Sequence, residues 1–189
     1  MSAFLKQLIS IKTAIVSAIE TVGVAAWKAL LAGVTFALTG NGLLAVGVLA
    51  AGFILEHIVS YAFKNPGERL PILRILGVAG VETVTWAGWL ALTMMDPILA
   101  AIVLFVGLFL GHALEQNTTR NCDGFLTRLL RAETLPFTAI ETATAIGWLA
   151  LAQSGPYLPN GLSANIVLFV GLQIEHAYSN ALPRRCYER

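Results

Sequence analysis

Long stretches without any charged residue most constrain the fold of this chain. Two of them are LLAVGVLAAGFIL at 43–55 and ILAAIVLFVGLFLG at 98–111. Each continues into an apolar segment of about 20 residues, the length that a helix needs to cross a bilayer. The chain is 57% hydrophobic and only 12% charged, with a mean hydropathy of +0.74, whereas a soluble domain of this size exposes more charge. We therefore predict a polytopic membrane protein in contact with the lipid bilayer.

The apolar stretches predict six membrane spans separated by polar connections. All six are expected to be α-helices, because a helix satisfies its own backbone hydrogen bonds in lipid. The predicted spans are 13–36, 43–63, 75–95, 97–117, 135–153 and 161–181. The predicted fold class is therefore all-α, with a single transmembrane domain over residues 1–189.

Basic residues are distributed unevenly among the connections. They lie before the first predicted span, after the second, after the fourth and at the end of the chain. These residues are Lys6, Lys12, Lys64, Arg69, Arg74, Arg120, Arg128, Arg131, Arg184, Arg185 and Arg189. The positive-inside rule then predicts a protein of a cell (inner) membrane with both termini in the cytoplasm. Orientation in the membrane also explains these residues better than binding to nucleic acid does. Lys28 is the one basic residue that this scheme leaves inside a span.

One two-helix unit recurs three times, over about 13–63, 75–117 and 135–181. The first helix of each unit carries Glu-Thr-x5-Trp-x-Ala-Leu, and the second carries Gly-x4-His. The matching residues are Glu20, Thr21, Trp27, Gly52 and His57 in the first unit, Glu82, Thr83, Trp89, Gly107 and His112 in the second, and Glu141, Thr142, Trp148, Gly171 and His176 in the third. This recurrence predicts three hairpins of similar structure.

A second glutamate lies near each of the three histidines. Glu56 and Glu175 directly precede their histidines, whereas Glu115 follows His112 by three residues. The positions one before and three after a residue lie on nearly the same helix face, because they differ by four residues. We therefore expect a carboxylate beside the histidine in all three units.

The glutamates and histidines are expected to form one polar layer. Counted from the uncharged connections at 1.5 Å per residue, they lie roughly 18–25 Å along their helices. Three similar hairpins would pack most simply around a pseudo-threefold axis, which brings the polar residues together. Heptad spacing places Trp27, Trp89 and Trp148 roughly 10 Å further along the helices, where we expect an apolar plug over the layer.

Uncompensated carboxylates are too costly for such a layer. One charge in the middle of a membrane costs about 3 kcal/mol on a lenient scale, so six would cost about 15–20 kcal/mol. That exceeds the ~5–15 kcal/mol net stability of a typical protein. The carboxylates must therefore be neutralised by protons, by partners or by metal ions.

The ligand types favour a buried metal site, di- or trinuclear. The predicted ligands are Glu20, Glu56, His57, Glu82, His112, Glu115, Glu141, Glu175 and His176. Carboxylates and imidazoles without nearby cysteine suit iron best here, with zinc or manganese as alternatives. Thr21, Thr83 and Thr142 are expected to orient the carboxylates by hydrogen bonds. The ligand chemistry is analogous to that of carboxylate-bridged di-iron proteins, although the Glu-x-x-His order of those proteins does not occur here.

Three functional classes fit this pattern. The first is a metal-dependent enzyme, such as an oxidoreductase acting on a lipid-soluble or small-molecule substrate. The second is a transporter or channel for a divalent cation or protons, because intramembrane acidic and histidine residues mark such pathways. The third is a structural or pigment-binding subunit of a larger membrane complex or homo-oligomer, with haem or a pigment bound by histidine. The sequence leaves open whether the protein is an enzyme.

Overall fold

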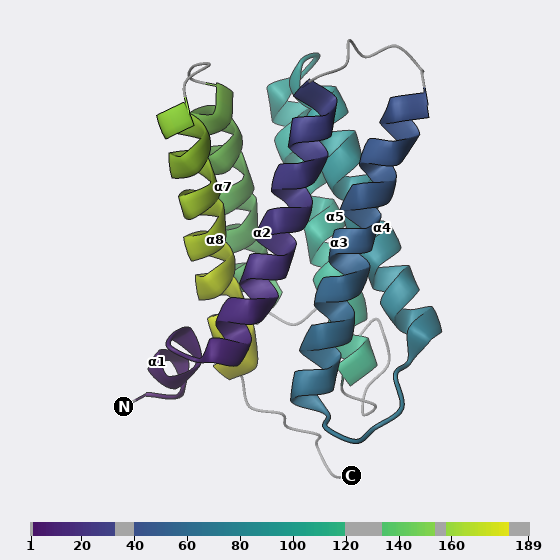
Figure 1. Cartoon of the computed structure of the whole chain (residues 1–189), viewed down its shortest axis with the longest axis vertical. Coiled ribbons are helices and arrows are strands. Elements are labelled where there is room, and N and C mark those ends of the chain that lie inside the picture. The colour runs from purple at the N-terminus through teal and green to yellow at the C-terminus, as the bar shows by residue number, and fades with distance from the viewer. Residues whose placement is uncertain (1, 33–39, 120–133, 154–157, 182–189) are drawn as a thin grey trace.

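All the regular secondary structure in the described part of the chain is α-helical. A computed structural model describes residues 2–32, 40–119, 134–153 and 158–181. Its helices are α1 (Ala3–Leu8), α2 (Ile11–Ala32), α3 (Gly40–Lys64), α4 (Ile72–Thr93), α5 (Pro97–Thr119), α7 (Thr134–Gln153) and α8 (Leu158–Ala181) (Figure 1). The predicted all-α fold class is confirmed, and the six long helices overlap the six predicted segments, although residues 33–36 of the first segment lie outside the described residues.

Local sequence explains where α5 and α1 begin. The Asp96 carboxylate accepts hydrogen bonds from the backbone N–H groups of Ile98 and Leu99, directly before α5. Pro97 then occupies the first helical position, where the missing N–H has no intrahelical partner to lose. Ser2 accepts a hydrogen bond from the N–H of Leu5 in the same way at the start of α1.

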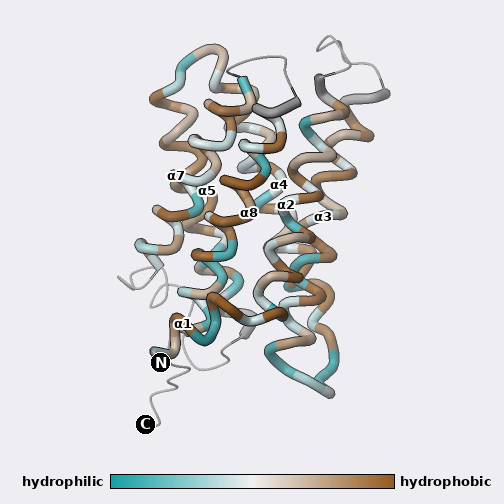
Figure 2. Tube along the Cα trace, turned by 60° about the vertical axis from the view of Figure 1, so that its left-hand side comes forward, coloured by the Kyte–Doolittle hydropathy of each residue, from teal (hydrophilic) through white to brown (hydrophobic). Residues whose placement is uncertain are grey.

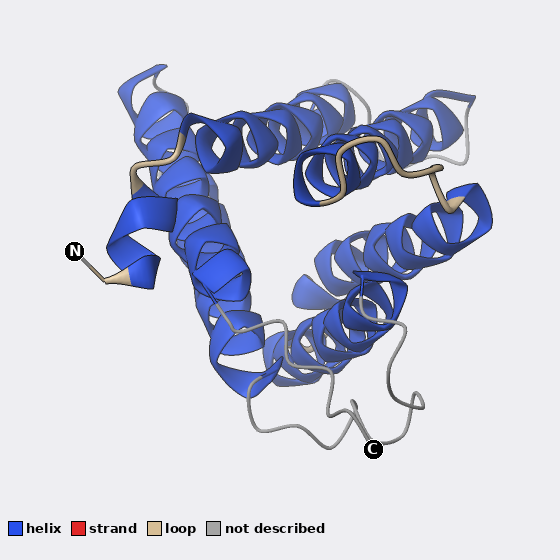
Figure 3. Ribbon diagram, turned by 90° about the horizontal axis from the view of Figure 1, so that it is seen from below, coloured by secondary structure: helices blue, strands red, loops and turns tan. Residues whose placement is uncertain are grey.

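The six long helices pack as neighbours in a closed ring. Chain neighbours α2 and α3, α4 and α5, and α7 and α8 form three antiparallel hairpins (Figure 1). Helix α3 also contacts α4, α5 contacts α7, and α8 returns to α2. Figure 3 shows the helices end-on, arranged around the centre of the bundle. The short helix α1 lies against α8, where Gln173 donates a hydrogen bond to the carbonyl of Leu8. We call the end of the bundle at which α2 begins and α8 ends the terminal end.

Small residues set how closely the two helices of each hairpin approach. In the first hairpin a Cβ on Gly52 would lie 2.9 Å from the Cα of Gly23, so the two backbones meet directly. In the second and third hairpins Gly107 and Gly171 receive the side chains of Thr85 and Thr144, leaving no room for a Cβ. The glycine five residues before each histidine is therefore a packing residue.

Five of the long helices, α2, α3, α4, α5 and α7, are long and apolar enough to cross a membrane. Their outward side chains are apolar: Leu73 is 87% exposed, Leu43 is 82% exposed and Val84 is 73% exposed. Such a surface is stable against lipid and indicates an integral membrane protein. Hydrophobic residues accordingly run along the length of the bundle (Figure 2).

Helix α8 is less apolar than the other five long helices and is not among the candidate spans of the described residues. It carries polar side chains in both halves, among them Asn165, Gln173 and Glu175. The sixth span therefore stays a prediction, as do the threefold arrangement of the hairpins and their origin as copies of one unit.

Candidate functional site

Three buried Glu–His pairs connect the hairpins to one another. His57 Nε2 on α3 lies 2.7 Å from Glu82 Oε2 on α4. His112 Nε2 on α5 lies 2.8 Å from Glu141 Oε2 on α7. His176 Nε2 on α8 lies 3.1 Å from Glu20 Oε2 on α2. Each histidine thus meets the Glu-Thr glutamate of the next hairpin in the ring, and none of these pairs lies within one hairpin.

Two of the three histidines contact a second carboxylate. Glu56 Oε2 lies 2.8 Å from Nδ1 of His57, and Glu175 Oε2 lies 2.8 Å from Nδ1 of His176. Each of these imidazoles therefore has a carboxylate at both ring nitrogens. Both hydrogen bonds require a proton at each nitrogen or on the facing carboxyl group.

The middle histidine has different surroundings. Gly111 takes the place of the preceding glutamate, and a Cβ there would lie 3.2 Å from Cγ of Glu82. The ring of Phe137 stands edge-on to the imidazole, with the centroids 4.7 Å apart. Glu141 lies at ion-pair distance from Nε2 of His112. Neither ring nitrogen of His112 has a hydrogen-bond partner among the described residues.

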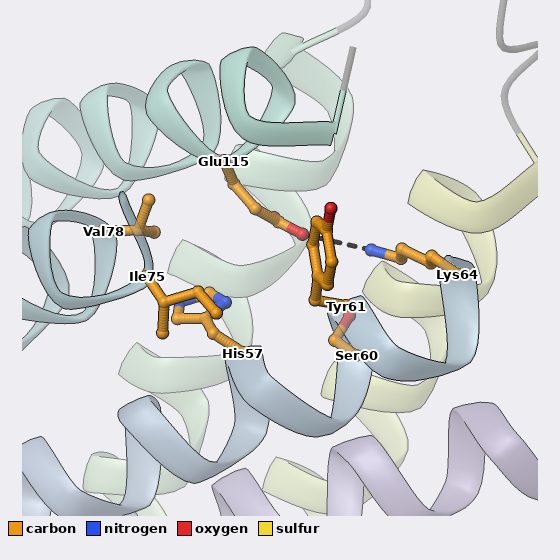
Figure 4. Close-up of a pocket in the computed structure, with 7 residues that line it drawn as sticks. All are labelled: His57, Ser60, Tyr61, Lys64, Ile75, Val78 and Glu115. Atoms are coloured by element: carbon orange, nitrogen blue, oxygen red, sulfur yellow. Dashed lines mark hydrogen bonds and ion pairs between the residues drawn. The ribbon is translucent and has the colours of Figure 1, made fainter. Parts of the chain in front are cut away.

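Glu115 is ion-paired with a lysine of another helix. Its Oε1 lies 3.1 Å from Nζ of Lys64, the last residue of α3. The sequence pattern places Glu115 beside His112, and a direct contact between these two residues stays a prediction. The Lys64–Glu115 pair lies at the mouth of a small cavity that also reaches His57 (Figure 4).

Carboxylates outnumber imidazoles in this buried layer. The layer contains the five glutamates Glu20, Glu56, Glu82, Glu141 and Glu175, which are 3–7% exposed, together with the three histidines. We call these five glutamates and three histidines the buried layer. Even with all three imidazoles protonated, two of the five carboxylates have no positive counterpart within the layer. The layer is therefore suited to bind further protons or a cation.

The three threonines that follow the Glu-Thr glutamates differ in their contacts. Thr21 donates a hydrogen bond to the carbonyl of Ser17, and Thr83 donates one to the carbonyl of Ala79. Both hydroxyls thus use their proton within their own helix. The buried hydroxyl of Thr142 has no hydrogen-bond partner among the described residues. An orienting role of these threonines toward the carboxylates stays a prediction.

Trp27, Trp89 and Trp148 are buried in one apolar core. A fourth tryptophan, Trp86, lies among them and is fully buried, with its ring centroid 5.5 Å from that of Trp89 and 6.1 Å from that of Trp148. Lys28, the basic residue left inside a span, places its Nζ 5.1 Å from the centroid of Trp148. A cation over an aromatic face gains electrostatic stabilisation that partly offsets its loss of hydration.

The described residues do not form a ready metal site. Within residues 2–32, 40–119, 134–153 and 158–181, no group of three or more His, Cys, Asp or Glu is in a position to hold a metal ion. The contacts among the histidines and glutamates form one pair and two triads, each of which joins two adjacent hairpins. The predicted di- or trinuclear centre therefore gains no geometrical support.

Sequence reasoning missed Lys64 and Trp86 as members of the site and its core. Lys64 follows His57 by seven residues, so both lie on one face of α3, but it reads as an ordinary basic residue at the end of a span. Trp86 follows Glu82 by four residues and has no tryptophan at the equivalent positions of the other units, so the repeat concealed it.

No protein family, no curated protein and no solved structure matches this chain, so the geometry of the buried layer is the basis for inferring its function.

Proposed function

We propose that this protein is an intramembrane proton relay, in which the Glu–His pairs take up, exchange and release protons. The observation that carries the proposal is the excess of buried carboxylates over imidazoles. A charge inside a bilayer costs about 3 kcal/mol or more, so the two uncompensated carboxylates favour binding two further protons. Histidine is the side chain best suited to exchange such protons near neutral pH.

The two carboxylate–imidazole–carboxylate triads supply a route for the proton. A proton that leaves the carboxyl group of Glu56 forms a bond to Nδ1 of His57. The bond between Nε2 and its own proton then breaks, and that proton moves to the carboxylate of Glu82. The ring ends with the charge that it had at the start, while one proton has passed from α3 to α4. Glu175, His176 and Glu20 have the same order of contacts.

The apolar core gives the relay a direction. Trp27, Trp86 and Trp148 are at most 1% exposed, and heptad spacing places Trp27 and Trp148 about 10 Å beyond their glutamates, away from the terminal end. In this conformation the layer therefore exchanges protons with the terminal end. Net transport across the bilayer requires the tryptophan layer to open.

The proposal includes an architecture of six spans. Three hairpins of one ancestral unit would surround a pseudo-threefold axis, and the head-to-tail order of the Glu–His pairs around the ring supports it. Helix α8 would be the sixth span, because it packs in the ring beside α2 and α7. The basic connections would place both termini in the cytoplasm of a cell with this protein in its inner membrane.

Metal binding is a second candidate function, favoured by one observation. In the three pairs, the histidine nitrogen and the carboxylate oxygen are 2.7–3.1 Å apart. Two ligands that bond one ion at about 2.0–2.2 Å have a similar separation. Iron would suit these donors best, with zinc or manganese as alternatives, and a bound iron would add redox chemistry on a lipid-phase substrate.

Proton flux into liposomes tests the relay. The purified protein is reconstituted with an internal pH-sensitive dye, and a potassium diffusion potential drives proton entry. We expect flux above that of empty liposomes and its loss in a Glu20→Gln/Glu82→Gln/Glu141→Gln variant. Asp96→Asn is the matched control, because it removes an exposed carboxylate outside the layer and asparagine retains the helix cap. Flux that is absent, or equal in the triple variant, would overturn the relay.

Metal content by mass spectrometry separates the second candidate from the first. The wild-type protein is compared with a His57→Ala/His112→Ala/His176→Ala variant after purification in detergent. Stoichiometric iron, zinc or manganese that is lost in the variant would establish a metal protein. Folded protein that binds none of these ions on reconstitution would exclude that function and leave the relay.

A further inference from the structure

A small cavity lies between His57 and the Lys64–Glu115 ion pair. It has a volume of about 20 Å³, enough for about one water molecule at a time, and it is partly open. Helix α3 lines it with His57, Ser60, Tyr61 and Lys64, which recur every three or four residues and so share one helix face. Figure 4 shows Glu115 of α5 reaching Lys64 across this cavity.

Exposure decreases along the cavity from its mouth to the imidazole. The side chains of Lys64 and Glu115 are 18% and 21% exposed, whereas that of His57 is 8% exposed. Ile75 and Val78 of α4 form the apolar wall facing these groups. The partly exposed ion pair therefore lies between the outside and a buried proton acceptor.

We infer that this cavity is the port through which protons reach the Glu56–His57–Glu82 triad, and that the Lys64–Glu115 ion pair is its gate. The inference rests on the proposed relay and names the place where protons enter it. While the pair is closed, the ammonium of Lys64 occupies the mouth and neutralises the Glu115 carboxylate, which would otherwise attract a hydrated proton. When the ion pair separates, the lysine leaves the mouth and one water is able to connect Glu115 with the imidazole.

The residues that follow His57 on its helix differ from those that follow the other two histidines, which supports a port that is specific to His57. The residue seven places after the histidine is Lys64 in the first hairpin but Thr119 and Pro183 in the others. The residue three places after it is Ser60 in the first, Glu115 in the second and Ser179 in the third. Ser60→Leu and Ser179→Leu are therefore matched substitutions, only the first of which fills the cavity.

The exchange of imidazole N–H protons with deuterium tests the port, measured by nitrogen-detected NMR in lipid. We expect Ser60→Leu to slow exchange at His57 and to leave His176 unchanged, while Ser179→Leu leaves His57 unchanged. Lys64→Met should accelerate exchange at His57, and Lys12→Met is its control, because it removes an exposed lysine of the same end without touching the cavity. Lys64 is half-buried, so this variant stays informative if Ser60→Leu does not fold.

The outcomes separate the port from the relay. Exchange at His57 that is unaffected by Ser60→Leu and Lys64→Met overturns the port, even if liposomes show proton flux. If Ser60→Leu slows exchange at His57 but wild-type liposomes show no proton flux, the port is retained and the relay is rejected. Slower exchange at His57 in both serine variants would mean a general packing effect and would also overturn the port.

Discussion

His176 on α8 and Glu20 on α2 are separated by 156 residues in the chain, yet their side chains lie 3.1 Å apart. This contact joins the last hairpin to the first and closes the ring of helices. It has the same chemistry as the His57–Glu82 and His112–Glu141 pairs, which join the other hairpins. The buried layer therefore contributes to the fold as well as to the proposed proton exchange.

Removing a histidine should destabilise the protein according to the number of carboxylates that it leaves unpaired. His176→Leu leaves Glu175 and Glu20 without their imidazole, and we expect a loss of about 3–5 kcal/mol in the free energy of unfolding. His112→Leu leaves only Glu141 and should cost less. Unfolding by titration with denaturing detergent measures both, and equal losses would contradict the charge argument.

Helix contact in the first hairpin depends on Gly52. An alanine there would place its Cβ 2.9 Å from the Cα of Gly23, so the helices must separate. We expect Gly52→Ala to destabilise the protein by about 1–3 kcal/mol. Gly47→Ala on the same helix is the control, because a Cβ there meets nothing within 4 Å among the described residues, and helix propensity favours alanine by about 1 kcal/mol. Thermal unfolding in detergent compares them; similar melting temperatures would contradict the predicted close contact.

Trp86 is a fully buried member of the apolar core. Its ring packs against Phe53, Trp89 and Trp148. Trp86→Ala should cost about 3–5 kcal/mol, and Trp86→Phe less, because part of the volume is retained. Val84→Ala on the exposed face of α4 should change stability little. The prediction fails if truncation of Trp86 is tolerated as well as truncation of Val84 in the same unfolding assay.

The position of α1 depends on Gln173. The side-chain N–H of Gln173 donates to the carbonyl of Leu8 at 2.7 Å and holds the end of α1 against α8. Gln173→Leu should lose about 1 kcal/mol of docking free energy and increase backbone hydrogen exchange over residues 3–9. Asn165 lies on α8 as Gln173 does and accepts a hydrogen bond from the indole N–H of Trp148 on α7. Asn165→Leu should therefore leave the exchange over residues 3–9 unchanged. Unaltered exchange in Gln173→Leu would show that apolar contacts alone hold α1.

Much of the secondary structure is predictable from local patterns. Apolar stretches longer than the typical helix of a soluble protein predicted the long helices. Asp96 and Pro97 mark where α5 begins. Helix α8 shows the limit of this reasoning. Its Asn165, Gln173 and Glu175 make it less apolar and contact Trp148, the end of α1 and His176, respectively, so composition alone does not establish it as a span.

The pairing within the site was not predictable in the same way. Helical periodicity indicates which residues share a face, as for His57 and Lys64, but it does not indicate which helix lies opposite that face. The expectation of one converging cluster followed from the shared depth of the glutamates and histidines. In the structure each imidazole contacts a carboxylate of the adjacent hairpin, and His57 and His176 also contact the glutamate that precedes them on their own helix.

The amino-acid sequence by itself determined that this chain forms long apolar helices, that glutamate and histidine recur at fixed spacings along them, and that glycine lies one turn and a half before each histidine. These properties depend on composition and on the geometry of a single helix. Only the tertiary structure decided that His57 meets Glu82, that Glu115 meets Lys64 and that Trp86 occupies the core. Those contacts depend on the order and rotation of packed helices, which arise from side-chain packing between segments distant in the chain.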